Sequence, residues 1–296
     1  MSTATAPERA HRRAASPARL TWRRFAKNRL ALTGAVFLIL LGIVVVVGPT
    51  IYRALGGYGP YEITCPAFSP PISGHLLGCD ALGRDFFARL LDGGRVSLTV
   101  GVAVAGLTTI TGLVLGAVAG FYAGRIDNLL MRFTDTVMAL PSLFLILAAA
   151  AILGPSLTNT ILVLSFIEWT TPARLVRGEF LTLRERDFVL AARSQALPGW
   201  RIMRQILRNI VPTILVAGTL AMAMAILAES GLSYLGMGTQ PPQASWGYML
   251  SDAQTYFMSR PRLAVWPGLL IMLTVLAANF AGDGLRQALD PRLRGR

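Results

Sequence analysis

The chain has 296 residues, of which 53% are hydrophobic and only 15% charged, and its mean hydropathy is +0.54. A soluble domain needs far fewer apolar residues to fill its core, so this composition excludes a soluble globular protein and predicts an integral membrane protein. The formal net charge of +13 is also typical of nucleic-acid-binding proteins. Here, however, the basic residues stand beside apolar runs, which indicates membrane loops and argues against a nucleic-acid partner.

Two residue counts bear on catalysis. Lys27 is the single lysine and follows an alanine, whereas a nucleotide-binding P-loop needs lysine between glycine and Ser or Thr. The two histidines are His11, near the N-terminus, and His75, in a predicted outer loop, so neither a histidine-based triad nor a zinc cluster can be assembled from them. We expect no catalytic site, no metal site and no cofactor in this chain.

The N-terminal part predicts three successive segments. Residues 1–20 are rich in Ala, Arg, Pro and Ser, which is typical of a disordered tail, here cytoplasmic. Residues 21–29 mix aromatic and basic side chains, which predicts an interfacial elbow helix. Residues 30–51 form an apolar run that can cross a hydrocarbon core of about 30 Å. Because this run is longer than the apolar part of a signal peptide, we expect an uncleaved first transmembrane helix.

Residues 52–95 are expected to form an extracytoplasmic loop. This loop contains both cysteines of the chain, Cys65 and Cys79. Extracytoplasmic space is oxidising and the enclosed loop is short, which favours a disulfide between them. Two unpaired thiols remain the alternative.

Residues 96–290 are expected to form a five-helix core. The apolar runs in this part cover residues 96–122, 131–153, 157–176, 210–234 and 263–285. With the first helix they make six spans, which places both termini on one side of the membrane. Of the 28 Lys and Arg residues, 22 lie on that side, so it is the cytoplasmic side. The prediction is an all-α polytopic membrane protein with a second cytoplasmic tail at residues 291–296.

Glycines recur at every fourth position of the second span. They are Gly112, Gly116, Gly120 and Gly124. Small residues at this spacing allow two helix backbones to approach closely in lipid. A packing seam is the first interpretation, and a lining of the substrate path is the second.

Three acidic residues fall within or beside the predicted spans: Asp135, Glu168 and Glu229. A carboxylate near the centre of a membrane helix costs about 2.5–3.5 kcal/mol on the insertion scale. These side chains should therefore face protein or water. They would serve either as structural hydrogen-bonding partners or as contacts for a solute.

Residues 177–209 form a polar segment between two apolar runs. After a Leu-Pro-Gly break at residues 197–199, apolar side chains repeat at helical spacing, and Arg201, Arg204 and Arg208 share the opposite face. The small side chains around residues 189–192 would let another protein approach closely. The pattern predicts a helix, a corner and an amphipathic helix at the cytoplasmic face. It is either a lever for a soluble partner or an ordinary loop.

A second outer loop is expected at residues 236–262. It carries Pro241, Pro242 and Trp246, and rigid turns with aromatic side chains suit the docking of a partner protein. Anchoring of Trp246 at the membrane interface is the alternative interpretation.

Several short sequences together resemble one family. Residues 77–85 (LGCDALGRD) are similar to the LGTDxLGRD signature of the C-type permeases of ABC importers for dipeptides, oligopeptides and nickel, with cysteine replacing threonine. The other matching stretches are residues 173–179 (ARLVRGE), 183–189 (LRERDFV), 229–236 (ESGLSYLG), 240–242 (QPP), 245–247 (SWG), 282–286 (GDGLR) and 289–293 (LDPRL). The resemblance covers nearly the whole chain after Thr21.

The polar segment resembles the coupling segment of the same family, with departures. Leu190 stands where the family has glutamate, Ala196 where it has glycine, Gln205 for histidine and Arg208 for proline. The resemblance implies contact with an ATPase subunit for a set of residues around the corner. They are Arg186, Val189, Leu190, Ala191, Ala192, Arg193, Ala196 and Gly199.

The resemblance implies a six-span permease of the type I ABC importer fold in the bacterial cytoplasmic membrane. Its partners would be a homologous B-type permease, two ABC ATPase subunits or one fused ATPase, an extracytoplasmic solute-binding protein and membrane lipid. ATP and Mg²⁺ would bind to the ATPases. This chain would form half of the pathway for di- and oligopeptides.

Other cargos and other classes of protein stay open at this point. Nickel, glutathione or haem could use the same architecture. A secondary transporter driven by an ion gradient could use the three acidic residues as a relay, although the sequence has no inverted repeat that would support it. A membrane scaffold that binds through its outer loops is the third alternative.

Overall fold

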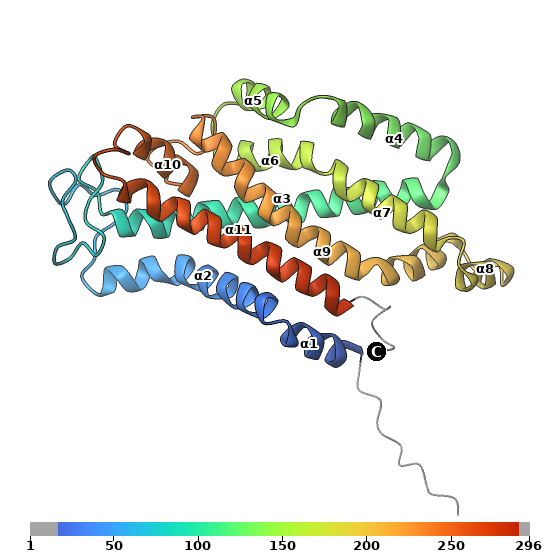
Figure 1. Cartoon of the computed structure of the whole chain (residues 1–296). Helices are drawn as coiled ribbons and strands as arrows, with labels where there is room; N and C mark the ends of the chain where they lie inside the picture. The colour runs from blue at the N-terminus through green and yellow to red at the C-terminus, as the bar shows by residue number, and fades with distance from the viewer. Residues whose placement is uncertain (1–16, 290–296) are drawn as a thin grey trace, which may run out of the picture.

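The computed structural model describes residues 17–289, and this part of the chain is nearly all helix (Figure 1). The helices are α1 (Pro17–Lys27), α2 (Arg29–Ala54), α3 (Phe86–Tyr122), α4 (Gly124–Ala139), α5 (Ser142–Leu153), α6 (Leu157–Glu168), α7 (Thr170–Leu183), α8 (Asp187–Ser194), α9 (Gly199–Tyr234), α10 (Trp246–Gln254) and α11 (Arg262–Leu289). Three isolated β-bridges lie between α2 and the start of α3. The prediction of an all-α fold is confirmed.

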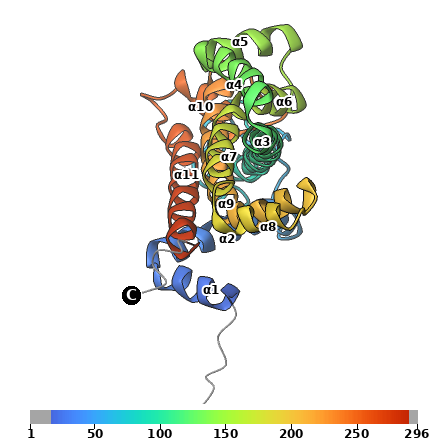
Figure 2. The ribbon, with the colours of Figure 1, turned by 90° about the vertical axis from the view of Figure 1, so that its right-hand side faces the viewer.

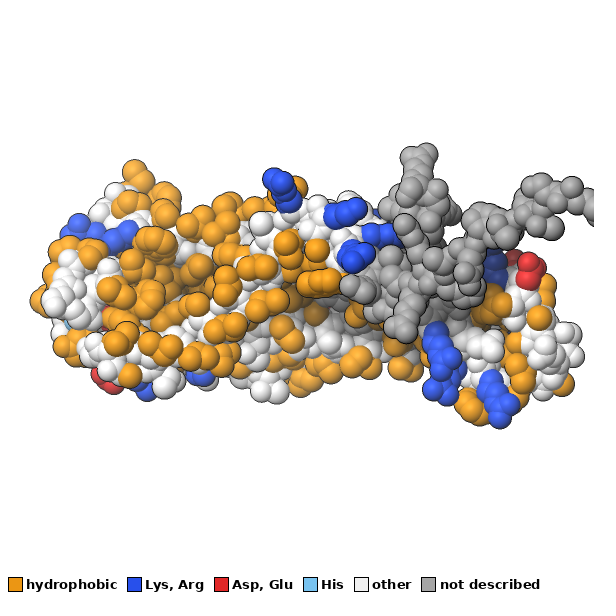
Figure 3. Space-filling model, turned by 90° about the horizontal axis from the view of Figure 1, so that it is seen from below, with side chains coloured by type: hydrophobic (Ala, Val, Ile, Leu, Met, Phe, Trp, Pro, Cys, Tyr) orange, Lys and Arg blue, Asp and Glu red, His pale blue; other side chains and the backbone are white. Residues whose placement is uncertain are grey.

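The long helices α2, α3, α9 and α11 run along the molecule (Figure 1). The loop between α2 and α3 lies with α10 at one end, which we call the outer end. The helix α8, the start of α1 and the end of α11 lie toward the other, which we call the inner end. Many apolar side chains of α2, such as Ile39, Leu40 and Ile43, are exposed. Figure 3 shows hydrophobic side chains over much of one face, with most of its Lys and Arg toward the ends, as a membrane protein requires.

Four of the six predicted spans are continuous helices long and apolar enough to cross a membrane: α2, α3, α9 and α11. The run at residues 131–153 is divided into α4 and α5, which meet at an angle of 85° and count as a fifth span only if taken together. Leu140 is extended (φ −90°, ψ 136°), as a residue before proline prefers, and Pro141 caps α5. This proline was the missed signal for the bend.

The run at residues 157–176 is also divided, into α6 and α7. Pro172 has no backbone N–H and cannot donate to the carbonyl of Glu168, which ends α6. Neither helix alone is long enough to count as a span, so residues 17–289 contain four such spans, or five with the bent pair, in place of the predicted six.

Several predicted boundaries shift. Helix α1 begins at Pro17, inside the stretch predicted to be a tail, and residues 1–16 and 290–296 lie outside the described part. The outer loop ends at Asp85 and not at residue 95, because the carboxylate of Asp85 accepts a hydrogen bond from the backbone N–H of Ala88 (2.8 Å) and caps α3.

The glycine row of α3 packs against α7, which confirms the predicted seam for three of the four glycines. An added Cβ would lie 2.8 Å from the backbone nitrogen of Ala173 at Gly112, and 2.4 Å from the Cβ of Phe180 at Gly120. Gly124 lies beyond the end of α3 at a φ of +61°, with open space around it. Figure 2 shows α3, α7 and α9 gathered side by side in the end view.

Candidate functional site

The helix α8 rests on the first turns of α9 at the inner end of the molecule. Val189 and Ala192 are buried and pack in one cluster with Ile202 and Ile206 of α9. The remaining residues predicted to face an ATPase are exposed: Arg186, Leu190, Ala191, Arg193, Ala196 and Gly199. Two residues of the predicted contact set therefore hold α8 in place, and the others form a surface that a partner can reach.

An open groove of about 480 Å³ lies between α8 and α9. Its lining residues are Phe188, Ala191, Ala192, Gln195, Leu197, Gln205, Arg208 and Asn209. Gln205 and Arg208, two of the departures from the family pattern noted in the sequence, thus line the groove. Sequence reasoning did not assign Phe188 and Asn209 to this site. The corner between α8 and α9 decides which parts of the two helices face each other, and the sequence does not show its geometry.

The corner after α8 is held by backbone hydrogen bonds. The N–H of Ala196 donates to the carbonyl of Arg193 (2.9 Å), and the N–H of Leu197 donates to the carbonyl of Ala192 (3.1 Å). This pair of bonds is a Schellman motif, and Ala196 occupies its left-handed position with a φ of +50°. A residue other than glycine pays about 1–2 kcal/mol there. The corner is therefore fixed but strained at Ala196.

At the outer end, Asp80 of the LGCDALGRD motif organises a charged cluster. Its carboxylate accepts hydrogen bonds from the backbone N–H of Leu82 (2.8 Å) and Arg84 (2.9 Å). The Arg84 side chain donates to the same carboxylate (2.7 Å), and Arg89 pairs with it at 3.3 Å. Arg89 is only 1% exposed. A buried guanidinium is tolerated because Asp80 and nearby Asp252 supply negative charge.

The second aspartate of the motif, Asp85, joins the loop to two helices. Besides capping α3, its carboxylate accepts a hydrogen bond from the hydroxyl of Tyr52 in α2 (2.8 Å) and lies 2.7 Å from Nδ1 of His75. His75 in turn stacks on Tyr58. The motif is thus a structural device that fixes the outer loop on α2 and α3.

Cys65 and Cys79 form a disulfide in the structure, with their Cα atoms 6.6 Å apart. This is one of the two alternatives that the sequence left open. A ligand atom of His75 lies within 4.8 Å of both sulfurs. Because the sulfurs are bonded to each other, they offer no thiolate to a metal ion.

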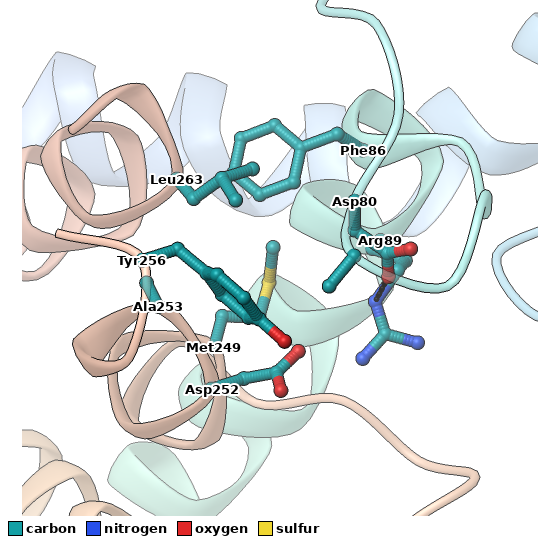
Figure 4. A pocket seen from close by; sticks show the side chains of 9 residues that line it. Asp80, Phe86, Arg89, Met249, Asp252, Ala253, Tyr256 and Leu263 are labelled. Atoms are coloured by element: carbon teal, nitrogen blue, oxygen red, sulfur yellow. Dashed lines mark ion pairs between the residues drawn. The ribbon is translucent and has the colours of Figure 1, made fainter. Parts of the chain in front are cut away.

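A small cavity of about 10 Å³ separates the charged cluster from α10 (Figure 4). Asp80 and Arg89 line one side, and Asp252 and Tyr256 line the other. Burial raises the pKa of Asp252, and the positive charges of Arg89 and Arg84 oppose this shift. The cavity is large enough for a water molecule and far too small for a peptide.

The three acidic residues singled out in the sequence have different surroundings. The carboxylate of Asp135 pairs with Arg174 of α7 at 2.5 Å, and both side chains are about half exposed. Glu168 is half-buried at the end of α6. Glu229 is fully buried and accepts hydrogen bonds from Ser97 (3.0 Å) and Ser233 (2.7 Å). Sequence reasoning did not pair Glu229 with Ser97, because the two residues are 132 positions apart.

A further ion pair between α4 and α7 was not anticipated. Arg177 donates two hydrogen bonds to the carboxylate of Asp127, at 2.5 and 2.7 Å. Paired guanidinium and carboxylate groups of this kind are geometrically specific. With the pair formed by Asp135 and Arg174, it holds the bent arm of α4 and α5 on the body of the protein.

The prediction that Trp246 contacts a binding protein is wrong for this conformation. Trp246 is 0% exposed, and its indole Nε1–H donates to the carbonyl of Leu90 in α3 (3.0 Å). A large aromatic ring with one donor is well suited to such a buried position. Pro241 and Pro242 of the same predicted set are exposed and accessible at the outer end.

Comparisons with known proteins identify the family of this chain. Residues 112–295 match the family model described as binding-protein-dependent transport system inner membrane component. Residues 16–71 match the N-terminal transmembrane domain of oligopeptide transport permease C.

Similar curated proteins extend over almost the full chain. The dipeptide transport system permease protein DppC of Alkalihalophilus pseudofirmus is 38% identical over 95% of this chain and 92% of its own length. The glutathione transport system permease protein GsiD of Pectobacterium atrosepticum is 38% identical over 94% of this chain and 92% of its own length. A putative peptide transport system permease protein of Brucella abortus is 40% identical over 94% of this chain and 93% of its own length. The chain therefore belongs to the family of binding-protein-dependent transport system inner membrane components.

Proposed function

We propose that the chain is the permease subunit of an ATP-driven importer and forms half of a translocation pathway for short peptides. The observation that carries this proposal is the position of the groove beside α8. It lies at the inner end, on a corner that leads directly into α9, and the outer loops lie at the opposite end (Figure 1). A protein bound at this groove can displace a helix that reaches the other face of the membrane.

The proposed assembly contains a homologous B-type permease, two ABC ATPase subunits or one fused ATPase, and an extracytoplasmic solute-binding protein. ATP and Mg²⁺ bind to the ATPases, in keeping with the lack of a P-loop in this sequence. The chain lies in the bacterial cytoplasmic membrane with both termini in the cytoplasm. The helix α1, the end of α11 and the groove at the inner end then share the cytoplasmic side (Figure 1).

The proposed cargo follows from the names of the relatives, which transport dipeptides, peptides and glutathione. Glutathione is itself a short peptide, so all the named cargos belong to one chemical class. Nickel and haem would be other cargos for the same architecture. In the proposed assembly the solute-binding protein selects the cargo.

The test is purification of the tagged chain in mild detergent together with its candidate partners. We expect two ATPase domains and a second permease to copurify, and a binding protein loaded with dipeptide to stimulate ATP hydrolysis. Ala191→Trp places a large ring in the groove and should reduce copurification of the ATPases. Gln254→Trp, at an exposed position at the outer end, is the matched control. A chain that purifies without ATPases and takes up solute along an ion gradient would instead be a secondary transporter.

A further inference from the structure

One buried carboxylate connects three helices near the outer end. Glu229 of α9 is 0% exposed. One of its oxygens accepts a hydrogen bond from the hydroxyl of Ser97 in α3 (3.0 Å), and the other accepts one from the hydroxyl of Ser233 (2.7 Å). Each serine hydroxyl thus points its hydrogen toward Glu229 and keeps the lone pairs of its oxygen for other donors.

The two serine hydroxyls donate their hydrogens to Glu229, and their oxygens accept hydrogen bonds from backbone N–H groups. Ser97 Oγ accepts from the N–H of Trp246 (3.2 Å), and Ser233 Oγ accepts from the N–H of Thr239 (3.2 Å). These two N–H groups stand at the two ends of residues 239–246, the segment that leads into α10. A single side chain of α9 therefore orients the groups that hold both ends of this segment.

Close packing reinforces the same junction. A Cβ on Gly94 of α3 would lie 2.6 Å from the ring of Trp246, and one on Gly247 would lie 2.5 Å from the Cα of Ser230 in α9. The first turn of α10 is thus wedged between the backbones of α3 and α9. It has no room to slide on either of them.

The opposite end of α9 begins at Gly199, directly after the corner beside α8. The helix has 36 residues and is therefore about 54 Å long. Figure 1 shows it running from the neighbourhood of α8 to that of α10. One helix, with Pro212 inside it, therefore connects the corner to the turn that contains Glu229.

We propose that Glu229 is a positioning residue that makes α10 move together with α9, so that a movement at the α8 groove is relayed to the second outer loop, residues 236–262. This inference rests on the proposed function, because the relay acts only when a partner moves α8. It adds to that function a named junction between the inner groove and the outer loop. Glu229 would act through Ser97, Ser233 and the backbone of α10, without touching the solute.

The experiment is hydrogen exchange measured by mass spectrometry on the assembled transporter, with and without ATP, for wild type and variants. Ser97→Ala removes one oxygen, and Glu229→Ala removes the whole junction. Thr108→Val is the control, because Thr108 is a buried hydroxyl of the same helix that bonds only to carbonyls of its own helix among the described residues. Stimulation of ATP hydrolysis by the loaded binding protein is measured in parallel.

In the wild type we expect exchange at residues 238–248 and around the α8 corner to respond to ATP. In Ser97→Ala and Glu229→Ala, exchange at residues 238–248 should rise on the order of tenfold, as for one lost hydrogen bond. It should also stop responding to ATP, while the response at the α8 corner persists. Stimulation by the binding protein should fall in the same variants and stay at the wild-type level in Thr108→Val.

Each other result contradicts a specific statement. If residues 238–248 still respond to ATP in both variants, Glu229 does not relay the movement. If the wild type responds at α8 but not at residues 238–248, the relay is absent although the proposed function stands. If the wild type responds at neither place and the binding protein gives no stimulation, the proposed function itself fails. Should Glu229→Ala not assemble, Ser97→Ala decides between these outcomes.

Discussion

Gly116 of α3 lies so close to Ala173 of α7 that an added Cβ would stand 2.4 Å from the Ala173 carbonyl oxygen. That oxygen belongs to the backbone of a helix and cannot rotate away as a side chain would. The two helices therefore approach as closely as their backbones permit. One turn farther along α7, Arg177 pairs with Asp127 of α4.

Replacing Gly116 with alanine should force α3 and α7 apart. We expect a loss of about 1–3 kcal/mol of stability, as for overpacking of a tight interior. Thermal unfolding in detergent measures the change. Gly106→Ala is the matched control, since it lies in the same helix and nothing stands within 4 Å of its added Cβ. That control should be neutral or slightly stabilising, and equal losses in both variants would contradict the seam.

The seam and four of the spans could be predicted because both depend on local pattern. An apolar run of sufficient length predicts a span, and glycine at every fourth position predicts a packing seam, without knowledge of the fold. The divided spans were within reach too, since Pro141 and Pro172 mark the breaks. The spans were predicted from the length of their apolar runs, and a single proline does not shorten such a run.

The junction at Glu229 could not be predicted in the same way. Its serine partner in α3 and the backbone N–H of Trp246 are far away in sequence. The sequence showed a carboxylate that needed a polar partner, but not which one. Trp246 was misjudged for a related reason. Aromatic residues in an outer loop suggest a docking surface, and only the position of α10 between α3 and α9 shows that this ring is buried.

Removing the disulfide between Cys65 and Cys79 should destabilise the outer loop. The two cysteines are 14 residues apart, and closing a loop of this length contributes about 3 kcal/mol in the chain-entropy account. We expect the double variant Cys65→Ser/Cys79→Ser to unfold at a lower temperature than the wild type. Reduction of the wild type should give the same shift and should leave the double variant unchanged. Labelling of both cysteines in native, unreduced protein would show that the bond is absent.

The raised pKa of Asp252 predicts a pH-dependent stability. Because burial raises this pKa above its ordinary value of about 4, the favourable contribution is fully present below about pH 4 and is lost as the pH rises through the folded-state pKa. Asp252→Asn does not titrate, so it should unfold at a higher temperature than the wild type at neutral pH. The difference should disappear below about pH 4. Glu185→Gln, which removes an exposed carboxylate, is the control. A variant less stable at neutral pH would mean that the attraction of Asp252 to Arg89 and Arg84 outweighs the cost of burial.

Replacing Ala196 with glycine should relax the corner between α8 and α9. Ala196 has a φ of +50°, where glycine avoids a penalty of about 1–2 kcal/mol but loses roughly 0.5–1 kcal/mol through its greater freedom in the unfolded chain. A net gain of about 0.5–1 kcal/mol is expected, measured as slower hydrogen exchange of the N–H groups of Ala196 and Leu197. Ala191→Gly, at an exposed helical position of α8, should instead destabilise by about 1 kcal/mol. A loss of stability in both variants would show that Ala196 is not strained. A gain confined to Ala196→Gly would show that the strain lies in the backbone at this corner.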